Sequence, residues 1–157
     1  MSTLHTASET TIDAPASTVL AVLRDFDGKH RKILPPAFSN FVVEQGGKGA
    51  GTVIRFDITL GGRTESARAW VEEPAPGVIE EHIIGRHMVT TFTVRPDGEG
   101  ARTRIETLWR PVPGLAGLVE RLFAPRMLRQ IYLDELANLD DVARSARVDT
   151  EMGTVAG

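Results

Sequence analysis

The chain has 157 residues, with 18 Lys and Arg against 21 Asp and Glu, and therefore a net charge of −3. Hydrophobic residues make up 41% of it and charged residues 25%, a balance typical of one globular domain that excludes collagen-like, coiled-coil and wholly disordered chains. The absence of cysteine excludes disulfides, thiolate metal sites and a cysteine nucleophile. Any chemistry must therefore come from carboxylate, imidazole, hydroxyl or arginine groups.

The first third of the chain predicts one strand followed by two short helices. Residues 1–8 are small and polar and are expected to form a flexible end. The β-branched residues of Glu9–Asp13 favour a strand, and a helix with an apolar face that includes Val19 and Leu23 follows it. A second helix is expected at Lys29–Leu34, because the two prolines after it cannot continue a helix.

The middle of the chain has the period of β-strands. Between Thr52 and Leu60 every second residue is apolar, the pattern of an antiparallel strand with one buried face. The pair Gly61-Gly62 that follows is a hairpin signal. Similar stretches, separated by turns, predict six strands in this region. They are Phe38–Gln45, Thr52–Leu60, Arg63–Glu73, Val78–Ile84, His87–Arg95 and Ala101–Arg110.

The last part of the chain returns to a helical period and carries two apolar stripes. The first stripe comprises Leu115, Leu118, Val119, Leu122 and Phe123. The second stripe comprises Leu128, Tyr132, Leu136, Leu139 and Ala143. On one continuous helix the second would be turned by more than about a quarter-turn from the first, so both can face one core only if the helix breaks or kinks at Pro125. Residues 145–157 lose the pattern and are expected to be a flexible tail.

This order of elements predicts a single α+β domain over residues 9–144, with the order β-α-α-β6-α. A sheet with one apolar face has to cover that face, and the C-terminal helix is the large apolar helix left to do so. We therefore expect a curved antiparallel sheet of about seven strands wrapped around a long C-terminal helix. Such an arrangement leaves a cavity between the sheet and the helix.

Four stretches of the chain carry a family resemblance: TIDAPASTVLAVLRDFDGKH, GKGAGTVIRF, VEEPAPGVIEEH and TFTVRPDGEGARTRIETLW. In this order, from Glu9 to about Val142, they resemble the helix-grip fold of the START and Bet v 1-like superfamily, and more narrowly the bacterial polyketide cyclase/dehydrase-like (SRPBCC) proteins. Many relatives carry a tryptophan shortly after the first helix, where this chain has His30 to Leu34. The resemblance implies a cavity for an apolar or amphipathic small molecule, since members include lipid and hormone carriers and polyketide aromatase/cyclases.

We expect apolar side chains on the inner faces of the sheet and the helix to line this cavity. The predicted ligand-binding residues are Ile54, Phe56, Ile58, Met88, Phe92, Ile105, Trp109, Met127 and Ile131. The candidates for catalytic groups, if the protein is an enzyme, are Glu65, His82, His87 and Tyr132. The polar residues from Glu80 to His87 are interpreted as strand ends rather than a metal site, since neighbours on a strand point to opposite faces.

The sequence thus favours the binding of a small hydrophobic molecule, lipid-like or polyketide-like, over two alternatives. One is an enzyme of the polyketide cyclase, aromatase or dehydratase type, and the other is an interaction domain whose cavity is filled by side chains. No cofactor and no metal are expected. Scattered charges argue against nucleic acid as a partner, and no apolar run approaches the ~18 residues of a transmembrane segment. The start of the chain lacks a secretion signal, so a cytoplasmic protein is expected, and a homodimer is left open.

Overall fold

The computed structural model describes residues 3–155, apart from the side chains of residues 115, 118, 119, 154 and 155. Its elements confirm the predicted order. They are β1 (Leu4–Ile12), α1 (Ala16–Arg24), α2 (Lys29–Ile33), β2 (Phe38–Gln45), β3 (Val53–Leu60), β4 (Arg63–Ala75), β5 (Val78–Ile83), β6 (Met88–Asp97), β7 (Gly100–Trp109) and α3 (Leu115–Val155).

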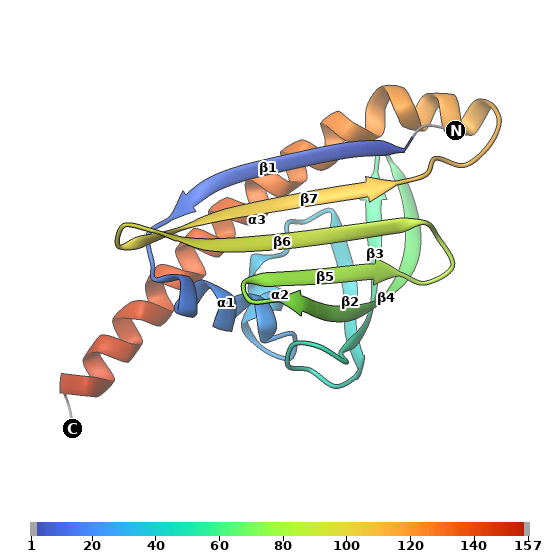
Figure 1. Cartoon of the computed structure of the whole chain (residues 1–157). Helices are drawn as coiled ribbons and strands as arrows, with labels where there is room; N and C mark the ends of the chain where they lie inside the picture. Colours follow the sequence, from blue (N-terminus) through green and yellow to red (C-terminus); the bar gives the residue numbers. More distant parts are fainter. Residues whose placement is uncertain (1–2, 156–157) are drawn as a thin grey trace.

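The seven strands form one antiparallel sheet in the order β1-β7-β6-β5-β4-β3-β2. Strands β2 to β7 follow one another as a meander, in which short turns join neighbouring strands. In the β3–β4 turn, Gly61 and Gly62 have φ values of 58° and 79°, the left-handed conformation that a tight hairpin needs and that glycine adopts without strain. β1 closes the sheet beside β7. Figure 1 shows the sheet curving strongly, with α3 crossing it from end to end.

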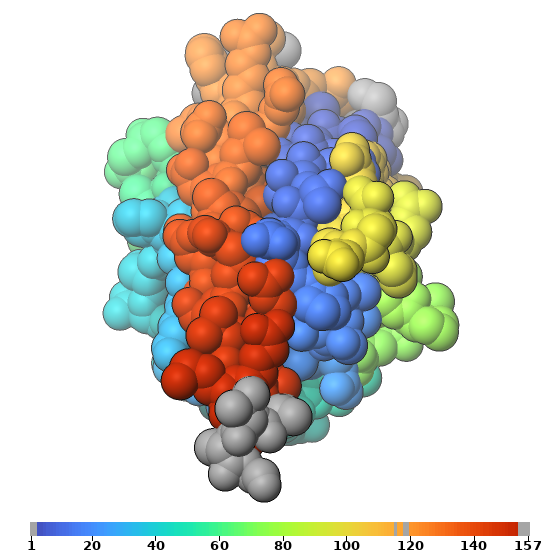
Figure 2. Space-filling model, turned by 90° about the vertical axis from the view of Figure 1, so that its left-hand side faces the viewer, coloured from blue at the N-terminus to red at the C-terminus, as the bar shows by residue number. Residues whose placement is uncertain are grey.

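The long helix α3 covers the concave face of the sheet. In Figure 2, α3 lies across the molecule between β1 and α1 on one side and the segment of α2 and β2 on the other. The second apolar stripe of α3 is buried and packs in one core with inward residues of the strands. This stripe is Leu128, Tyr132, Leu136, Leu139 and Ala143. The helix therefore covers the sheet as the sequence predicts.

Two residues of the first apolar stripe, Leu122 and Phe123, do not join this core. Leu122 and Phe123 are 61% and 59% exposed, and the side chains of the other three members lie outside the described residues. Of the predicted break or kink at Pro125, the break does not occur, because α3 is one helix that contains this proline. Because α3 continues through Pro125, the rotation between the two stripes accounts for the exposure of Leu122 and Phe123.

The N-terminal segment is also more ordered than its sequence predicts. β1 begins at Leu4 rather than Glu9 and pairs with β7 along its whole length. The hydroxyl groups of Thr6 and Ser8 are buried and donate hydrogen bonds to the carbonyl oxygens of Pro125 and Arg129, both at 3.0 Å. The flexible end predicted for residues 1–8 is therefore wrong for Leu4–Ser8, because α3 supplies acceptors for polar groups that would otherwise remain in water.

At the other end, α3 continues to Val155, through most of the segment predicted to be a tail. Ala146 is buried. Arg147 donates a hydrogen bond to the carbonyl oxygen of Asp13 at 3.1 Å and forms an ion pair with its carboxylate at 3.3 Å. These contacts hold the helix against the β1–α1 connection beyond residue 144, where the apolar period ends.

Candidate ligand-binding cavity

A cavity of about 900 Å³ lies between the concave face of the sheet, α2 and α3. One side of the cavity wall comes from β3, where every second residue from Ile54 to Leu60 is apolar, as predicted. Residues two apart on a strand point to the same face, so these apolar side chains all point into the cavity. Aromatic and aliphatic side chains form most of the lining. They include Leu34, Phe38, Phe41, Ile54, Phe56, Ile58, Leu60, Ile83, Met88, Phe92, Trp109, Met127 and Leu128.

Seven of the nine predicted ligand-binding residues line this cavity. They are Ile54, Phe56, Ile58, Met88, Phe92, Trp109 and Met127. Ile105 does not line the cavity and is fully buried in the core. Ile131 is partly buried and packs against that core, beside Tyr132, which does line the cavity. Alternation and helical period thus identify the inward faces, but they do not separate the residues that reach a cavity from those packed beneath it.

Four buried residues and the largely buried Glu81 give the cavity a polar region, which we name the buried polar cluster. They are His30, Glu81, Thr90, Tyr132 and Glu135. His30 comes from α2, Glu81 and Thr90 come from the strands β5 and β6, and the other two come from α3. These elements lie far apart in the sequence and are brought together by the curvature of the sheet around α3.

Glu81 and His30 face each other within the buried polar cluster. His30 donates its Nδ1 proton to the carbonyl oxygen of Leu23 at 2.8 Å, so Nε2 carries the lone pair, and this atom lies 3.6 Å from Oε1 of Glu81. Glu81 Oε1 is buried and has no hydrogen-bond partner within the described residues. Burial lowers the pKa of His30 to about 4 and raises the pKa of Glu81 to about 7. Both side chains are therefore neutral in mildly acidic solution.

Glu135 lies on the buried side of α3, three residues after Tyr132. It is 3% exposed, and within residues 3–155 its carboxyl group has no hydrogen-bond or ion-pair partner. Burial, with a smaller contribution from the nearby Glu81, raises the pKa of Glu135 well above its usual range. The cavity wall thus contains two carboxyl groups that favour their protonated forms.

Tyr132 ends a chain of hydroxyl groups behind this cavity wall. Its Oη lies 2.6 Å from Oγ1 of Thr107, which in turn lies 2.8 Å from Oγ1 of Thr90. Burial raises the pKa of Tyr132 to about 12, so its hydroxyl stays protonated at neutral pH. Of the four predicted catalytic candidates, Tyr132 alone lies deep in the cavity.

Glu65 lies at the mouth of the cavity, where the alternation of β4 places it. Its side chain is 58% exposed and lies 3.6 Å from the guanidinium group of Arg86. It is therefore solvated and does not belong to the buried polar cluster.

His82 and His87 lie outside the cavity, on the outer face of the sheet and in the turn after β5. The ring of His82 stacks on Trp70 with centroids 4.8 Å apart, and its Nε2 lies 2.8 Å from a carboxylate oxygen of Glu80. Donor atoms of Glu72, Glu80 and His82 lie within 4.8 Å of one another. These three residues form an ion-pair cluster at the surface, on the face of the sheet opposite the cavity.

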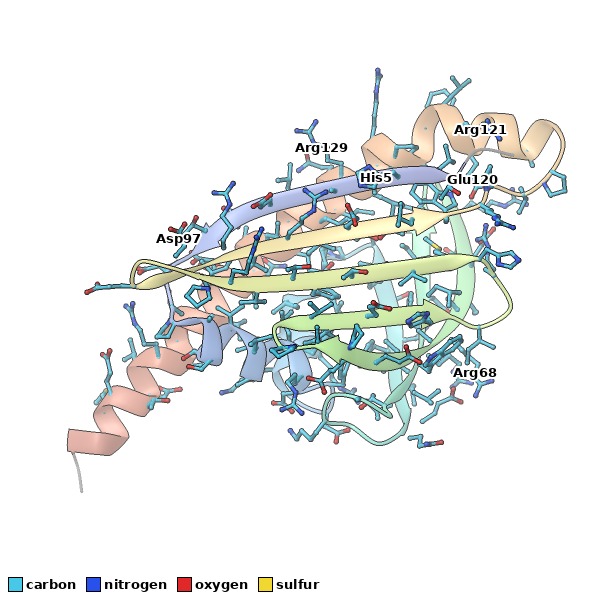
Figure 3. The ribbon with its side chains drawn as sticks, in the orientation of Figure 1. His5, Arg68, Asp97, Glu120, Arg121 and Arg129 are labelled. Carbon is cyan, nitrogen blue, oxygen red and sulfur yellow. The ribbon has the colours of Figure 1, made fainter. Side chains whose placement is uncertain are left out.

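The mouth combines charged and apolar side chains. Glu120 accepts hydrogen bonds from Trp109 Nε1 at 2.9 Å and from the backbone N–H of Val112 at 3.2 Å, and it lies 3.3 Å from Arg86. Figure 3 shows Glu120 at the end of the sheet where β7 leads into α3. The exposed side chains of Val112 and Phe123 also line this region. A ligand entering here would pass an apolar rim that is held in place by an ion-pair network.

Four members of the buried polar cluster, His30, Glu81, Thr90 and Glu135, are absent from the sequence-based candidates, and three of them occupy positions that the sequence marks as inward. Glu81 alternates with the buried residues Ile79 and Ile83, which was a signal that it points inward, but it was interpreted as a strand end. Glu135 follows Tyr132 by three positions on the buried stripe of α3. His30 precedes the buried Ile33 by one helical turn in α2. In each case the inward position is visible in the period of neighbouring apolar residues.

Comparison with known proteins gives a family and several structural relatives. Residues 3–144 match the family model described as polyketide cyclase / dehydrase and lipid transport. A solution structure of the KanY protein is 31% identical, with 92% of this chain and 99% of that chain covered and a TM-score of 0.82. Among curated proteins, none matches the sequence significantly.

More distant structures share the fold. The Zhui aromatase/cyclase from Streptomyces sp. R1128 is 15% identical, with 91% of this chain and 94% of that chain covered and a TM-score of 0.73. A START superfamily protein from Mycobacterium smegmatis is also 15% identical, with coverages of 93% and 98% and a TM-score of 0.61. Within residues 3–155, no helix is long and apolar enough to cross a membrane. Because the family model spans nearly the whole chain, this chain belongs to the polyketide cyclase/dehydrase and lipid transport family, with the helix-grip fold of the START and Bet v 1-like superfamily.

Proposed function

We propose that this protein binds a small apolar or amphipathic molecule in the cavity between the sheet and α3. The observation that carries the proposal is the cavity itself, which measures about 900 Å³ and is lined mainly by aliphatic and aromatic side chains. A cavity of this size holds a molecule of drug or lipid dimensions. Burial of the ligand's apolar surface would supply most of the affinity, at roughly 25 cal/mol per Å², and the buried polar cluster would orient it.

A pair of alanine-to-tryptophan variants on α3 tests this proposal. Ala124 is partly buried and lines the cavity, whereas Ala137 is exposed on the same helix. We expect wild-type protein to bind the neutral dye Nile red with one dye per chain. Ala124→Trp should weaken this binding at least tenfold by filling the cavity, and Ala137→Trp should leave it unchanged. Equal binding by both variants, or no binding by wild type, would contradict a ligand site in this cavity.

Native mass spectrometry of the purified protein complements the dye titration. It would detect a co-purified ligand as an added mass and would report whether the chain forms a dimer. A ligand bound to wild type and missing from Ala124→Trp would identify the natural occupant of the cavity directly.

An enzyme of the polyketide cyclase, aromatase or dehydratase type is the second candidate. The observation that favours it is the presence of ionisable groups of Glu81, Tyr132 and Glu135 in the cavity wall, since cyclisation and dehydration of a polyketone require proton transfer to and from the substrate. Incubation with a linear poly-β-ketone mimic, followed by mass spectrometry for loss of water, distinguishes an enzyme from a binder. Glu81→Gln and Glu135→Gln should then slow the reaction without preventing binding.

The third alternative, an interaction domain with a filled cavity, receives less support. Side chains of the described residues leave about 900 Å³ open. On the outer face of the sheet, Val53 and Val89 are only partly exposed. Trp70 and Leu108 on the same face are more exposed, at 38% and 45%, so they, and not Val53 and Val89, are the apolar side chains that a partner could contact.

A further inference from the structure

Two carboxyl groups lie in the cavity without a compensating positive charge. The side chain of Glu81 is 12% exposed and its Oε1 atom has no hydrogen-bond partner. Glu135 is 3% exposed. Within residues 3–155, no Lys or Arg forms an ion pair with either group. The nearest basic atom to Glu81 is Nε2 of His30, at 3.6 Å, and that imidazole is itself buried and neutral.

Two such carboxyl groups reduce the stability of the folded protein unless a ligand compensates their burial. Burying a carboxyl group without partners is unfavourable, and two of them together are more so, because each charge disfavours the other. A ligand hydroxyl or carbonyl could be hydrogen-bonded by a Ser, Thr or Gln side chain without this cost. Two carboxyls in an apolar wall are complementary to a group that brings a positive charge into the cavity.

We propose that the ligand of this cavity carries a basic amine, which binds at the carboxyl groups of Glu81 and Glu135 while its apolar part lies among the aromatic and aliphatic lining. This inference rests on the proposed function and specifies the class of its ligand. An ammonium group has three N–H donors. The free Oε1 of Glu81 and the carboxyl of Glu135 accept two of them, and the hydroxyls of Thr90 and Tyr132 are acceptors available in the same cluster.

The charge of the bound site depends on which carboxyl groups are protonated before the amine binds. A protonated amine pairs with ionised Glu81, so binding at a pH below about 7 displaces the proton of that carboxyl into solvent. Burial raises the pKa of Glu135 well above its usual range, so this group favours its protonated form and can accept a hydrogen bond through its carbonyl oxygen. The bound site then holds one positive and one negative charge. A carboxylate ligand, by contrast, would bring a second negative charge to the same place.

The pH dependence of amine binding comes from Glu81. From α2, His30 stays neutral above pH 5 because its pKa is about 4, and Asp25, which acts on that ring, remains ionised. From α3, Tyr132 stays neutral because its pKa is about 12. Between pH 5.5 and 8.5, Glu81 therefore changes from mainly protonated to mainly ionised. Affinity for an amine should rise over this range, whereas affinity for a neutral ligand should not.

Isothermal titration with three ten-carbon compounds tests the inference. Decylamine, decan-1-ol and decanoate share one apolar chain and differ in the end group. At pH 8.5 we expect wild-type protein to bind decylamine at least tenfold more tightly than decan-1-ol, and decanoate most weakly. At pH 5.5 the affinity for decylamine should fall at least tenfold, while that for decan-1-ol stays within threefold.

Matched variants identify the carboxyls responsible. Glu81→Gln, which removes the ionisable group, and, independently, Glu135→Leu, which removes the carbonyl acceptor, should each weaken decylamine binding at least tenfold and leave decan-1-ol binding within threefold. Glu80→Gln, on the opposite face of β5, should change neither. If decan-1-ol or decanoate binds as tightly as decylamine, or if both cavity variants retain the amine affinity, the amine inference is wrong and the cavity remains a binding site. If none of the three compounds binds, the proposed function fails together with this inference.

Discussion

The Nε2 atom of His30 faces the Oε1 atom of Glu81 at 3.6 Å, and between about pH 4 and pH 7 the pair is an uncharged base opposite an uncharged acid. Leu23 fixes this arrangement, because its carbonyl oxygen accepts a hydrogen bond from Nδ1 of His30. The pKa of His30 is lowered to about 4 and that of Glu81 is raised to about 7, in both cases mainly by burial. The two groups therefore differ from a salt bridge, in which both partners would be ionised.

Replacing Glu81 with Gln should change how stability depends on pH. The folded-state pKa of Glu81, about 7, lies above its ordinary value of 4.5, so its contribution to stability is fully present below pH 4.5 and is lost as pH rises through 7. The loss amounts to about 3 kcal/mol. Because Gln does not titrate, Glu81→Gln should become more stable relative to wild type by roughly that amount between pH 4.5 and 8.

Urea denaturation of wild type and Glu81→Gln at several pH values measures this difference. His30 titrates in the opposite sense, since its lowered pKa costs stability as pH falls from 6.5 to about 4. This contribution is present in both proteins and cancels in the comparison to first order. A stability difference that stays constant from pH 4.5 to 8 would contradict a buried, protonated Glu81.

Replacing Thr6 with Val should loosen β1 from α3. Thr6 donates a hydrogen bond to the carbonyl oxygen of Pro125, and Val keeps the shape of Thr while removing this donor. We expect a loss of about 1 kcal/mol and faster amide exchange in Leu4–Ser8, measured by urea denaturation and hydrogen exchange. Thr11→Val is the matched control on the same strand, because Thr11 is exposed. Equal exchange in both variants would show that the Thr6 hydroxyl does not hold the strand.

Truncating the two apolar stripes of α3 should have unequal effects. Leu136 is 1% exposed, so Leu136→Ala should cost about 2–5 kcal/mol. Phe123 is 59% exposed, so Phe123→Ala should cost less than about 1 kcal/mol. Denaturant unfolding of both variants compares them directly. Similar losses would mean that the first stripe packs in the core and that α3 bends more sharply at Pro125.

Sequence reasoning found the apolar wall of the cavity because that wall follows strict periods. Ile54, Phe56 and Ile58 alternate along β3, and all three line the cavity. Met88 and Phe92 do so from β6. Burial of apolar side chains dominates folding, so their spacing reports the inward face of a strand without knowledge of its partners.

The polar part of the cavity was missed because polar side chains are expected in water. Glu81 and Glu135 occupy inward positions of β5 and α3, yet carboxyl groups are rarely buried without partners, so Glu81 was interpreted as a strand end and Glu135 is not among the candidates. Thr6 and Ser8 were assigned to a flexible end for the same reason. The hydrogen-bond partner of a buried polar group often lies far away in the chain, so the local sequence does not reveal it. For Thr6 this partner is the carbonyl oxygen of Pro125.

The pairing of β1 with β7 also determines when a ligand site can exist during folding. β1 and β7 are far apart in the sequence, since His5 and Glu106, whose side chains are hydrogen-bonded at 2.7 Å, are 101 residues apart. Each of the strands β2 to β7, by contrast, pairs with the strand that precedes or follows it in the chain. Contacts of such long range form slowly. During synthesis, a ribosome would release β2 to β7 as a meander before α3 could close over it, with the concave apolar face exposed. The closed cavity would therefore form only after the last helix has docked.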